Sequence, residues 1–420
     1  MSGIVIQGGH RLAGDLHIHG SKNATLPIMA ASLLNAGYTI IKNCPYITDV
    51  EYMAQMLAGL GCKVYRYKEY LMIDSQAAFC TELRPELAGE LRASSLFMGA
   101  MLGRFGEAKI PLPGGCRIGS RPVDIHLAAL KLFGADYEIT DGQIVMKAAK
   151  LTGANIHLRM PSVGATENVL LAAAAAEGVT VLDNAACEPE ITALCKVLCL
   201  MGAEITGAGT SYITITGMKQ CQDVVYEAEP DRIVAGTYMC AVLAAGGRIH
   251  MRNVRDFSIA RGYLDVLSGI GLQCEQGEQG IVVCCEPGRL HAVHRIKTGA
   301  FPEFPTDMQS LVMSVLCKAD GISSIEETVF EKRLKLSEEL RKMGAEIAVQ
   351  GNCAQITGKE MLYGAQVQAT DLRASAALIV AALSAEGITR IDSDCYLRRG
   401  YENMIENLQM LGADIQTEVL

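Results

Sequence analysis

The sequence predicts an α/β protein of two domains, each an inside-out α/β barrel with three buried central helices and three sheets outside. Three observations support this fold class. A short ending of the form apolar, Gly, small, variable, Ile or Val occurs six times, and an apolar helix precedes each occurrence. The spacing also repeats, because the glycines of the last three endings lie 210 residues after those of the first three. The pairs are Gly61 and Gly271, Gly134 and Gly344, and Gly202 and Gly412. This pattern indicates a tandem duplication of a three-repeat half.

The six helices predicted at the centres of the domains are apolar nearly all round, which indicates burial. Each begins at a polar or charged residue and is expected to stop at a glycine. A β-rich stretch, an amphipathic outer helix and paired strands follow each of them. The repeat is therefore βαβαββ, with three copies in each domain. The predicted buried helices cover 22–37, 92–106, 162–178, 231–247, 307–321 and 371–387.

The last repeat has only one strand, ADIQTEVL, where the other repeats have a pair. The missing partner is expected at the other end of the chain, because IVIQGGHRLAGDLHIHG resembles AQITGKEMLYGAQVQAT in the fifth repeat. Residues 1–21 are therefore expected to complete a second domain with residues 231–420. Residues 22–230 are expected to form the first domain, with chain crossings near residues 21 and 230.

The composition indicates a globular protein that does not bind nucleic acid. Half of the 420 residues are hydrophobic and the formal net charge is −9, which argues against non-specific nucleic-acid binding. The fifteen cysteines include no CxxC and no Cys/His set at zinc spacing, so most are expected to be reduced, small, buried hydrophobes. No signal segment or apolar run of membrane-spanning length is found. We therefore expect a cytoplasmic protein without a membrane partner.

Two steps of the repeat are longer than their equivalents, and insertions in a regular repeat often carry function. The first insertion is PGGCRIGSRP, within the loop 112–122, where Cys116 lies near Arg117 and Arg121. Neighbouring cations favour a thiolate, so Cys116 is a candidate reactive cysteine. The second is KTGAFPEFPTD, which brings Asp307 to the start of a buried helix. Asp307 can be interpreted as a site residue or as the N-cap of that helix, and both interpretations can hold together.

Basic residues occupy equivalent places in the repeats. Four lie at starts of buried helices, and two lie thirteen residues before an outer-helix glycine: Lys22, Arg92, Arg232 and Arg373, then Arg121 and Arg399. Arginines can clamp phosphate or carboxylate, and helix N-termini facing a cleft between two domains would attract a phosphorylated ligand. The active site is therefore predicted in that cleft. The alternatives are that each cation is an ordinary surface charge and that the helix dipoles face water.

Seven segments read in order resemble the motifs of the enolpyruvyl transferase family: SKNATLP, LRAS, PGGCRIGSRPVD, PSVGAT, FPTDMQ, TDLRASAAL and RRGYE. The resemblance runs from about residue 4 to the C-terminus. It is strongest to members that act on UDP-N-acetylglucosamine, because the sister enzyme 5-enolpyruvylshikimate-3-phosphate synthase is not expected to carry the cysteine loop. The resemblance implies transfer of the enolpyruvyl group of phosphoenolpyruvate to the 3-hydroxyl of the sugar through a tetrahedral ketal, with release of phosphate. This is the first committed step of peptidoglycan synthesis, and no metal or organic cofactor is implied.

The resemblance also implies roles for individual residues. Cys116 would protonate the methylene carbon of phosphoenolpyruvate and be the residue that fosfomycin alkylates, and Asp307 would be the base near the sugar hydroxyl. Lys22 and Arg399 would complete the catalytic set. Residues implied for phosphoenolpyruvate are Lys22, Asn23, Arg92, Arg121 and Arg399. Those implied for UDP-N-acetylglucosamine are Asn23, Arg92, Arg121, Pro122, Val123, Asp124, Ile125, Ser162, Val163, Gly164, Asp307 and Val329, with Arg333, Arg373 and His126 supporting. Met160 and Pro161 stand where some members carry a lysine, which leaves one uracil or phosphate contact of the family unassigned in this sequence.

Two functions of other classes remain as alternatives. A sugar-nucleotide sensor or regulator without activity would be expected to have lost its reactive residues, whereas the proposed catalytic set is complete in the sequence. A clamp-like repeat protein is disfavoured by the acidic balance and by the arginines at helix starts. We therefore predict a monomeric transferase whose partners are its two small-molecule substrates. Domain closure over the sugar nucleotide is expected to bring the loop 112–122 down as a lid, so the ligand should protect that loop from protease.

Overall fold

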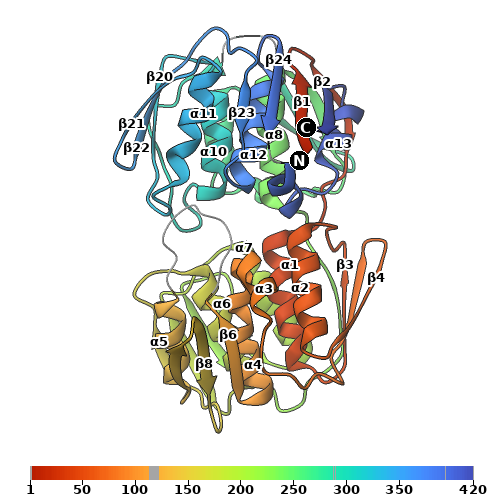
Figure 1. Cartoon of the computed structure of the whole chain (residues 1–420), viewed down its shortest axis with the longest axis vertical. Helices are drawn as coiled ribbons and strands as arrows, with labels where there is room; N and C mark the ends of the chain where they lie inside the picture. The colour runs from red at the N-terminus through yellow and green to blue at the C-terminus, as the bar shows by residue number, and fades with distance from the viewer. Residues whose placement is uncertain (1, 113–122, 287, 289, 393, 420) are drawn as a thin grey trace. The chain divides into compact units, whose positions relative to one another are not determined.

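The described chain forms two units, each with apolar helices at its centre and sheets around them (Figure 1). The computed structural model describes residues 2–112, 123–286, 288, 290–392 and 394–419. We call residues 20–112 and 123–229 the N-terminal unit, and residues 2–19 and 230–419 the C-terminal unit. Each unit has its own hydrophobic core.

The N-terminal unit contains three buried helical segments. They are α1 (Lys22–Ala31), which continues into η1 (Ser32–Leu34), α4 (Phe97–Phe105), which follows η2 (Arg92–Leu96), and α6 (Val163–Ala175). The outer helices are α2 (Thr48–Gly59), α5 (Asp124–Leu132) and α7 (Pro189–Met201), and α3 (Pro85–Glu90) is an additional short helix. The positions of the three buried helices agree with the sequence prediction.

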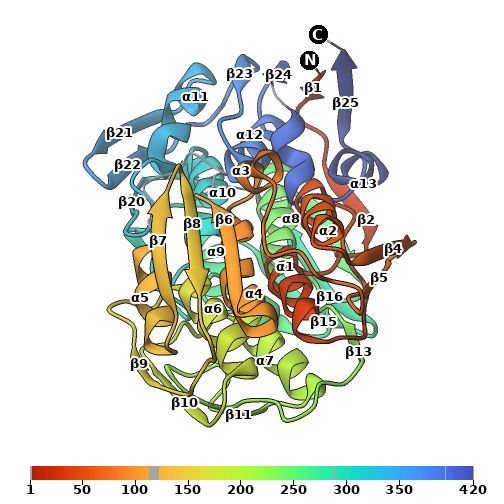
Figure 2. The ribbon, with the colours of Figure 1, turned by 60° about the horizontal axis from the view of Figure 1, so that its bottom comes forward.

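Three sheets enclose the helices of the N-terminal unit. Their strand orders are β13-β3-β5-β4, β6-β8-β7 and β9-β10-β12-β11, and the second is seen in Figure 2. The strands are β3 (Tyr38–Lys42), β4 (Lys63–Tyr67), β5 (Tyr70–Asp74), β6 (Glu107–Pro111), β7 (Asp136–Thr140), β8 (Gln143–Lys147), β9 (Asn155–His157), β10 (Val179–Asp183), β11 (Glu204–Thr206), β12 (Tyr212–Thr216) and β13 (Val224–Glu227). Alternate residues of a strand such as β5 are buried, so one face of the sheet covers the core.

The C-terminal unit repeats this arrangement. Its buried helices α8 (Arg232–Ala245), α10 (Thr306–Leu316) and α12 (Leu372–Leu383) pack against one another. The outer helices are α9 (Leu264–Ile270), α11 (Leu336–Lys342) and α13 (Met404–Met410), and the 3₁₀ turns are η3 (Phe257–Ala260), η4 (Arg333–Lys335) and η5 (Asp394–Arg399). The turns η4 and η5 carry the predicted residues Arg333 and Arg399.

Three four-stranded sheets surround these helices, and the short pair β17-β19 accompanies them. The strand orders are β2-β14-β16-β15, β18-β20-β22-β21 and β23-β24-β1-β25. The strands are β1 (Ser2–Gln7), β2 (Leu12–Leu16), β14 (Gly247–Met251), β15 (Gln273–Gly277), β16 (Gly280–Cys285), β17 (Leu290–His291), β18 (Ile296–Lys297), β19 (Ala319–Asp320), β20 (Ile322–Glu326), β21 (Glu346–Gln350), β22 (Cys353–Thr357), β23 (Gln366–Gln368), β24 (Ile388–Asp392) and β25 (Asp414–Val419). β1 lies antiparallel between β24 and β25, which is the strand pairing predicted for the N-terminal segment.

Glycine ends only some of the buried helices. Gly106 and Gly246 are the C-caps of α4 and α8 and have positive φ. Gly178, Gly321 and Gly387 also have positive φ but lie immediately before β10, β20 and β24, after their helices have ended. The expected glycine stop is therefore wrong for these three helices. Their glycines turn the chain into the next strand, a conformation that a residue with a Cβ rarely adopts. The expected stop is also wrong for the first buried helix, because η1 ends at Leu34 and Gly37 lies directly before β3.

The crossing of α4 and α6 depends on Gly99. A Cβ at this position would lie 2.4 Å from the backbone oxygen of Asn168, and backbone cannot move aside as a flexible side chain can. Gly99→Ala is therefore expected to lower the free energy of unfolding by about 2–3 kcal/mol, measured by urea denaturation. Gly89→Ala is the matched control, because Gly89 lies in α3 with open space around it. It should be neutral or stabilising by up to about 1 kcal/mol, and equal losses in both variants would contradict the crossing argument.

The cysteines are less uniformly buried than expected. Of the fourteen that the structure describes, seven are buried, four are half-buried and three are exposed, and all are free thiols. The exposed ones are Cys199, Cys353 and Cys395. Composition alone could not separate these three from the buried ones. Within the described residues, no helix combines the length and the apolar character that crossing a membrane would require.

Candidate active site

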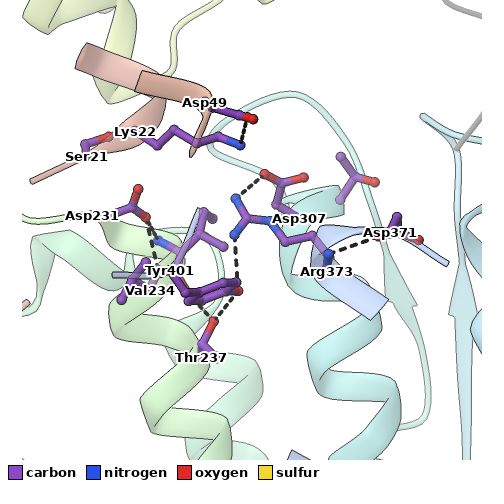
Figure 3. Close-up of polar contacts among 12 residues, drawn as sticks. Ser21, Lys22, Asp49, Asp231, Val234, Thr237, Asp307, Asp371, Arg373 and Tyr401 are labelled. Atoms are coloured by element: carbon purple, nitrogen blue, oxygen red, sulfur yellow. Dashed lines mark hydrogen bonds and ion pairs between the residues drawn. The ribbon is translucent and has the colours of Figure 1, made fainter. Parts of the chain in front are cut away.

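Asp307 lies in the first turn of α10, where two buried arginines hold its carboxylate. Arg333 Nη1 donates to Oδ1 at 2.9 Å. Arg373 Nη2 donates to Oδ2 at 2.8 Å (Figure 3). The two arginines are 4% and 5% exposed. Burial alone would raise the pKa of Asp307, but the charges of Arg373 and Arg333 outweigh it and hold that pKa well below its usual value. The site therefore presents a fixed, ionised carboxylate at neutral pH.

Asp307 does not cap its helix, so that part of the sequence interpretation is wrong. α10 begins at Thr306, its cap position is Pro305, and no side chain accepts a cap hydrogen bond there. Both oxygens of Asp307 are instead engaged by arginines that lie 26 and 66 residues away in the sequence. Because both carboxylate oxygens accept from distant arginines, the carboxylate does not accept from the N–H groups at the start of its own helix.

Glu327, which the sequence analysis missed, organises the segment beside Asp307. This side chain is 2% exposed. One of its oxygens accepts from the hydroxyl of Thr298 at 3.0 Å and from the N–H groups of Val329 and Phe330 at 2.8 and 3.0 Å. The other accepts from the hydroxyl of Thr306 at 2.9 Å. Glu327 therefore fixes both the start of α10 and the backbone of the predicted sugar contact Val329.

Arg373 and Arg399 lie on neighbouring elements of the C-terminal unit. Arg373 is the second residue of α12, and its N–H donates to the N-cap Asp371 at 2.9 Å. Burial alone would lower the pKa of Arg373, but Asp307 raises it above the usual value. Arg399 is the last residue of η5, which packs against α12. One unit thus gathers Asp307, Arg333, Arg373, Val329 and Arg399.

In the N-terminal unit, Lys22 and Asn23 are the first residues of α1, which Ser21 caps by accepting from the N–H of Ala24 at 3.3 Å. Lys22 Nζ lies 2.8 Å from Asp49 Oδ2 (Figure 3). Asp49 is only 2% exposed, in the first turn of α2. This pair holds the Lys22 ammonium at the helix start. Asp49 could not be singled out from the sequence, because an acidic residue in the first turn of an outer helix is ordinary.

The segment Ser162, Val163 and Gly164 forms the start of α6, with Ser162 as the N-cap that accepts from Ala165 N–H at 3.4 Å. Gly164 packs closely on the ring of His126, since a Cβ there would lie 2.9 Å from Cε1. Only glycine allows this approach without displacing the ring. The predicted supporting residue His126 therefore lies directly beside Gly164, one of the residues predicted to contact UDP-N-acetylglucosamine.

Asn168, a buried residue that the sequence analysis did not select, joins three helical segments here. Its Nδ2 lies 2.9 Å from His126 Nδ1 and 3.1 Å from the backbone oxygen of Ser95. Its Oδ1 accepts from Gly99 N–H at 2.8 Å. The side chain thus fixes α5, η2 and α4 against its own helix α6. Arg92, the first residue of η2, is positioned with them.

The start of α5 carries the remaining described candidates. Val123 precedes the helix and is 8% exposed, and Asp124 and Ile125 are its first two residues. Asp124 forms an ion pair with Arg159 at 2.5 Å, which links α5 to the segment before α6. Cys116, Arg121 and Pro122 lie outside the described residues. Among the residues that are described, no three His, Cys, Asp or Glu side chains are grouped so as to hold a metal ion.

The buried carboxyl of Glu167 in α6 should make the stability of the protein depend on pH. Burial, with smaller contributions from Glu190 and Glu188, raises its pKa well above the usual value. A carboxyl with a raised folded-state pKa contributes stability below its unfolded pKa, and that contribution is lost as the pH rises through the folded-state pKa. Glu167→Gln is therefore expected to stabilise the protein by about 1–3 kcal/mol at pH 8 and by less at pH 5.

Urea denaturation at the two pH values checks this expectation. Glu204→Gln is the matched control, because Glu204 is exposed in β11 and its substitution should change the free energy of unfolding by less than about 0.5 kcal/mol at both. A gain for Glu167→Gln that is larger at pH 5 than at pH 8 would reverse the sign and contradict the assignment.

Comparison with known proteins identifies relatives over the whole chain. The family model described as EPSP synthase (3-phosphoshikimate 1-carboxyvinyltransferase) matches residues 6–408. UDP-N-acetylglucosamine 1-carboxyvinyltransferase 2 of Caldanaerobacter subterraneus subsp. tengcongensis is 43% identical over 410 residues, 98% of each chain. UDP-N-acetylglucosamine 1-carboxyvinyltransferase of Desulfosudis oleivorans is 43% identical over 416 residues, 99% of each chain.

Solved structures share the architecture. The enolpyruvyl transferase NikO from Streptomyces tendae matches with a TM-score of 0.90 at 26% identity, covering 100% of this chain and 99% of that one. EPSP synthase from Acinetobacter baumannii matches with a TM-score of 0.76 at 16% identity over 100% of both chains, a likeness of fold. These matches confirm the fold class predicted from the repeats.

Proposed function

The chain belongs to the EPSP synthase family of enolpyruvyl transferases, and we propose that it transfers the enolpyruvyl group of phosphoenolpyruvate to the 3-hydroxyl of UDP-N-acetylglucosamine. The curated relatives that share 43% of its residues carry the name of this reaction. The sugar oxygen adds to C2 of phosphoenolpyruvate while C3 gains a proton, which gives a tetrahedral ketal. Loss of a proton from C3 and departure of phosphate restore the double bond. The product is the enolpyruvyl sugar nucleotide used in peptidoglycan synthesis.

The observation that carries this proposal is the carboxylate of Asp307, held on both oxygens by buried arginines. A carboxylate with a depressed pKa is a weak base, so it removes the hydroxyl proton only as the new C–O bond forms. It also orients the sugar hydroxyl by hydrogen bonding. The arginines keep it ionised and pointing in one direction for that purpose.

The cations at helix starts have matching roles in this proposal. Lys22, Arg92, Arg121 and Arg399 bind the phosphate and carboxylate of phosphoenolpyruvate and stabilise charge that develops in the transition state. The Lys22–Asp49 pair supports this role, because it holds the ammonium group at the start of α1.

The sugar nucleotide is bound in this proposal by Asn23, the start of α5 and the start of α6. Backbone N–H groups at the start of α6 are suited to a diphosphate, because a helix N-terminus favours anions. Cys116 delivers the proton to C3. In this proposal the chain acts as a monomer, and its partners are the two substrates. It acts in the cytoplasm, because both substrates are charged and do not cross a bilayer unaided.

Phosphate release from phosphoenolpyruvate tests the proposal, with UDP-N-acetylglucosamine and shikimate 3-phosphate offered separately as acceptors. Release with the sugar nucleotide alone is the expected result. Release with shikimate 3-phosphate would mean that the chain acts on the substrate of the sister enzyme. No release with either acceptor, together with calorimetric binding of the sugar nucleotide, would instead support the sensor alternative.

A further inference from the structure

The guanidinium of Arg373 is held at both ends, and the end away from Asp307 is held by a tyrosine. Arg373 Nη1 lies 3.1 Å from the hydroxyl of Tyr401, and the guanidinium carbon lies 5.7 Å from the centre of the tyrosine ring. Tyr401 is 3% exposed. Its hydroxyl also lies 2.9 Å from Thr237 Oγ1, in the second turn of α8 (Figure 3). Thr237 Oγ1 in turn donates to the backbone oxygen of Ile233 at 2.7 Å.

The donors in this chain of hydrogen bonds can be assigned from proton counting. A hydroxyl has one proton, and Thr237 uses its proton on Ile233. Tyr401 must therefore donate to Thr237, and the tyrosine oxygen accepts from Arg373. Burial raises the pKa of Tyr401 despite the charge of Arg373, so the hydroxyl keeps its proton at neutral pH. Every link is satisfied, and the chain ends on the backbone of α8.

We propose that Tyr401 and Thr237 are positioning residues for the transfer reaction, which orient Arg373 and through it the carboxylate of Asp307. The inference rests on the proposed function of Asp307. With Nη1 anchored to α8 through two hydroxyls, Nη2 has one direction in which to meet Asp307 Oδ2. Without the anchor, the guanidinium can rotate about its stem, and the carboxylate loses the partner that fixes its second oxygen.

The charges around this chain determine the expected pH effect. Asp307 faces Arg333 from η4 and Arg373 from α12. The carboxylate of Glu327, which follows β20, accepts from the neighbouring Thr306. Arg373 faces Asp307 and, at longer range, Asp231 at the start of α8. A looser Arg373 stabilises the Asp307 carboxylate less, so the pKa of Asp307 should rise. As the pH is lowered, a variant with a looser Arg373 should therefore lose activity at a higher pH than the wild type does.

Tyr401→Phe is the test variant, because it removes the hydroxyl and keeps the ring against the guanidinium. We expect kcat to fall about tenfold, with KM for both substrates changed less than threefold, since one hydrogen bond to a charged group is lost. The acid limb of the pH profile of kcat should move up by about half a unit to one unit. Thr237→Val should lower kcat and move the acid limb in the same directions by smaller amounts. Thr237→Ser, which keeps the hydroxyl, should have the kcat and the acid limb of the wild type.

Tyr238→Phe is the matched control. Tyr238 is the next residue of α8, fully buried, and its hydroxyl bonds Asn407 rather than Arg373. Both tyrosine variants are expected to lose thermal stability, but only Tyr401→Phe should move the acid limb. An equal shift in both variants, or an unshifted limb in Tyr401→Phe with wild-type kcat, would overturn the positioning role.

A second measurement keeps this inference separate from the proposed function. The Nη signals of labelled arginine report rotation of the guanidinium, and those of Arg373 are assigned by their loss in Arg373→Lys. Slow rotation in the wild type and faster rotation in Tyr401→Phe, but not in Tyr238→Phe, are expected whether or not the chain turns over. Identical rotation in all three proteins would refute the anchoring. Active wild-type protein with an unaffected Tyr401→Phe variant would refute the inference alone.

Discussion

Asp307→Asn is expected to lower kcat for phosphate release about a thousandfold, because the amide cannot accept the hydroxyl proton. The amide can still hydrogen-bond the sugar, so the dissociation constant for UDP-N-acetylglucosamine should change less than tenfold. The same substitution leaves Arg333 and Arg373 buried without their anion, which should lower the free energy of unfolding by about 3 kcal/mol. Steady-state kinetics, calorimetry and urea denaturation measure the three effects.

Two further variants separate chemistry from stability in this experiment. Asp307→Glu keeps the charge and moves the carboxylate, so it should retain more stability than Asp307→Asn while losing about a hundredfold in kcat. Asp256→Asn is the control, because Asp256 is an exposed cap of η3 and asparagine caps as well as aspartate. A fully folded Asp307→Asn protein with wild-type kcat would contradict the base role.

The fold could be predicted because its signal is distributed over the whole chain. Six apolar helices and six glycine endings at a repeated spacing report burial and turning directly, so one misread segment does not change the result. The pairing of β1 with β25 followed from the same repeat, since only the N-terminal segment resembled the missing strand. The glycine stops were partly wrong because a glycine with positive φ serves equally well to end a helix or to start a strand.

The surroundings of the site residues could not be predicted in the same way. Asp49, Glu327 and Tyr401 look like ordinary residues of a helix start, a strand end and a loop. Their partners Lys22, Thr298 and Arg373 lie 27 to 29 residues away in the sequence. The local sequence predicts a cap at Asp307, because a Thr-Asp pair comes before an apolar helix. The two arginines that bind Asp307 are too distant in the sequence for a local pattern to indicate them. Motifs identify residue types at a position, whereas ion pairs between repeats depend on packing that no local pattern records.

Cys116→Ser is expected to reduce phosphate release about a thousandfold as well, for a different reason. A serine hydroxyl is a far weaker acid than a thiol, so it should deliver a proton to C3 poorly. The sequence places Arg117 and Arg121 near Cys116, where they are expected to favour its thiolate. The substitution should leave the free energy of unfolding within about 1 kcal/mol of the wild type. Cys353→Ser, the same exchange at an exposed position of β22, should retain full activity.

Fosfomycin labelling tests the same cysteine without depending on turnover. The thiolate opens the epoxide, so a C–S bond forms, a C–O bond breaks, and the freed oxygen takes up a proton. Burial raises the pKa of Cys62, Cys195 and Cys317 to about 12, so these thiols hold almost no thiolate at pH 7.5 and should stay unlabelled. Mass spectrometry should therefore find one adduct, on the peptide that contains Cys116, and none in Cys116→Ser. An adduct on the exposed Cys353 instead would show that exposure rather than local charge sets thiol reactivity here. Wild-type activity in Cys116→Ser would contradict the proton-donor role of Cys116.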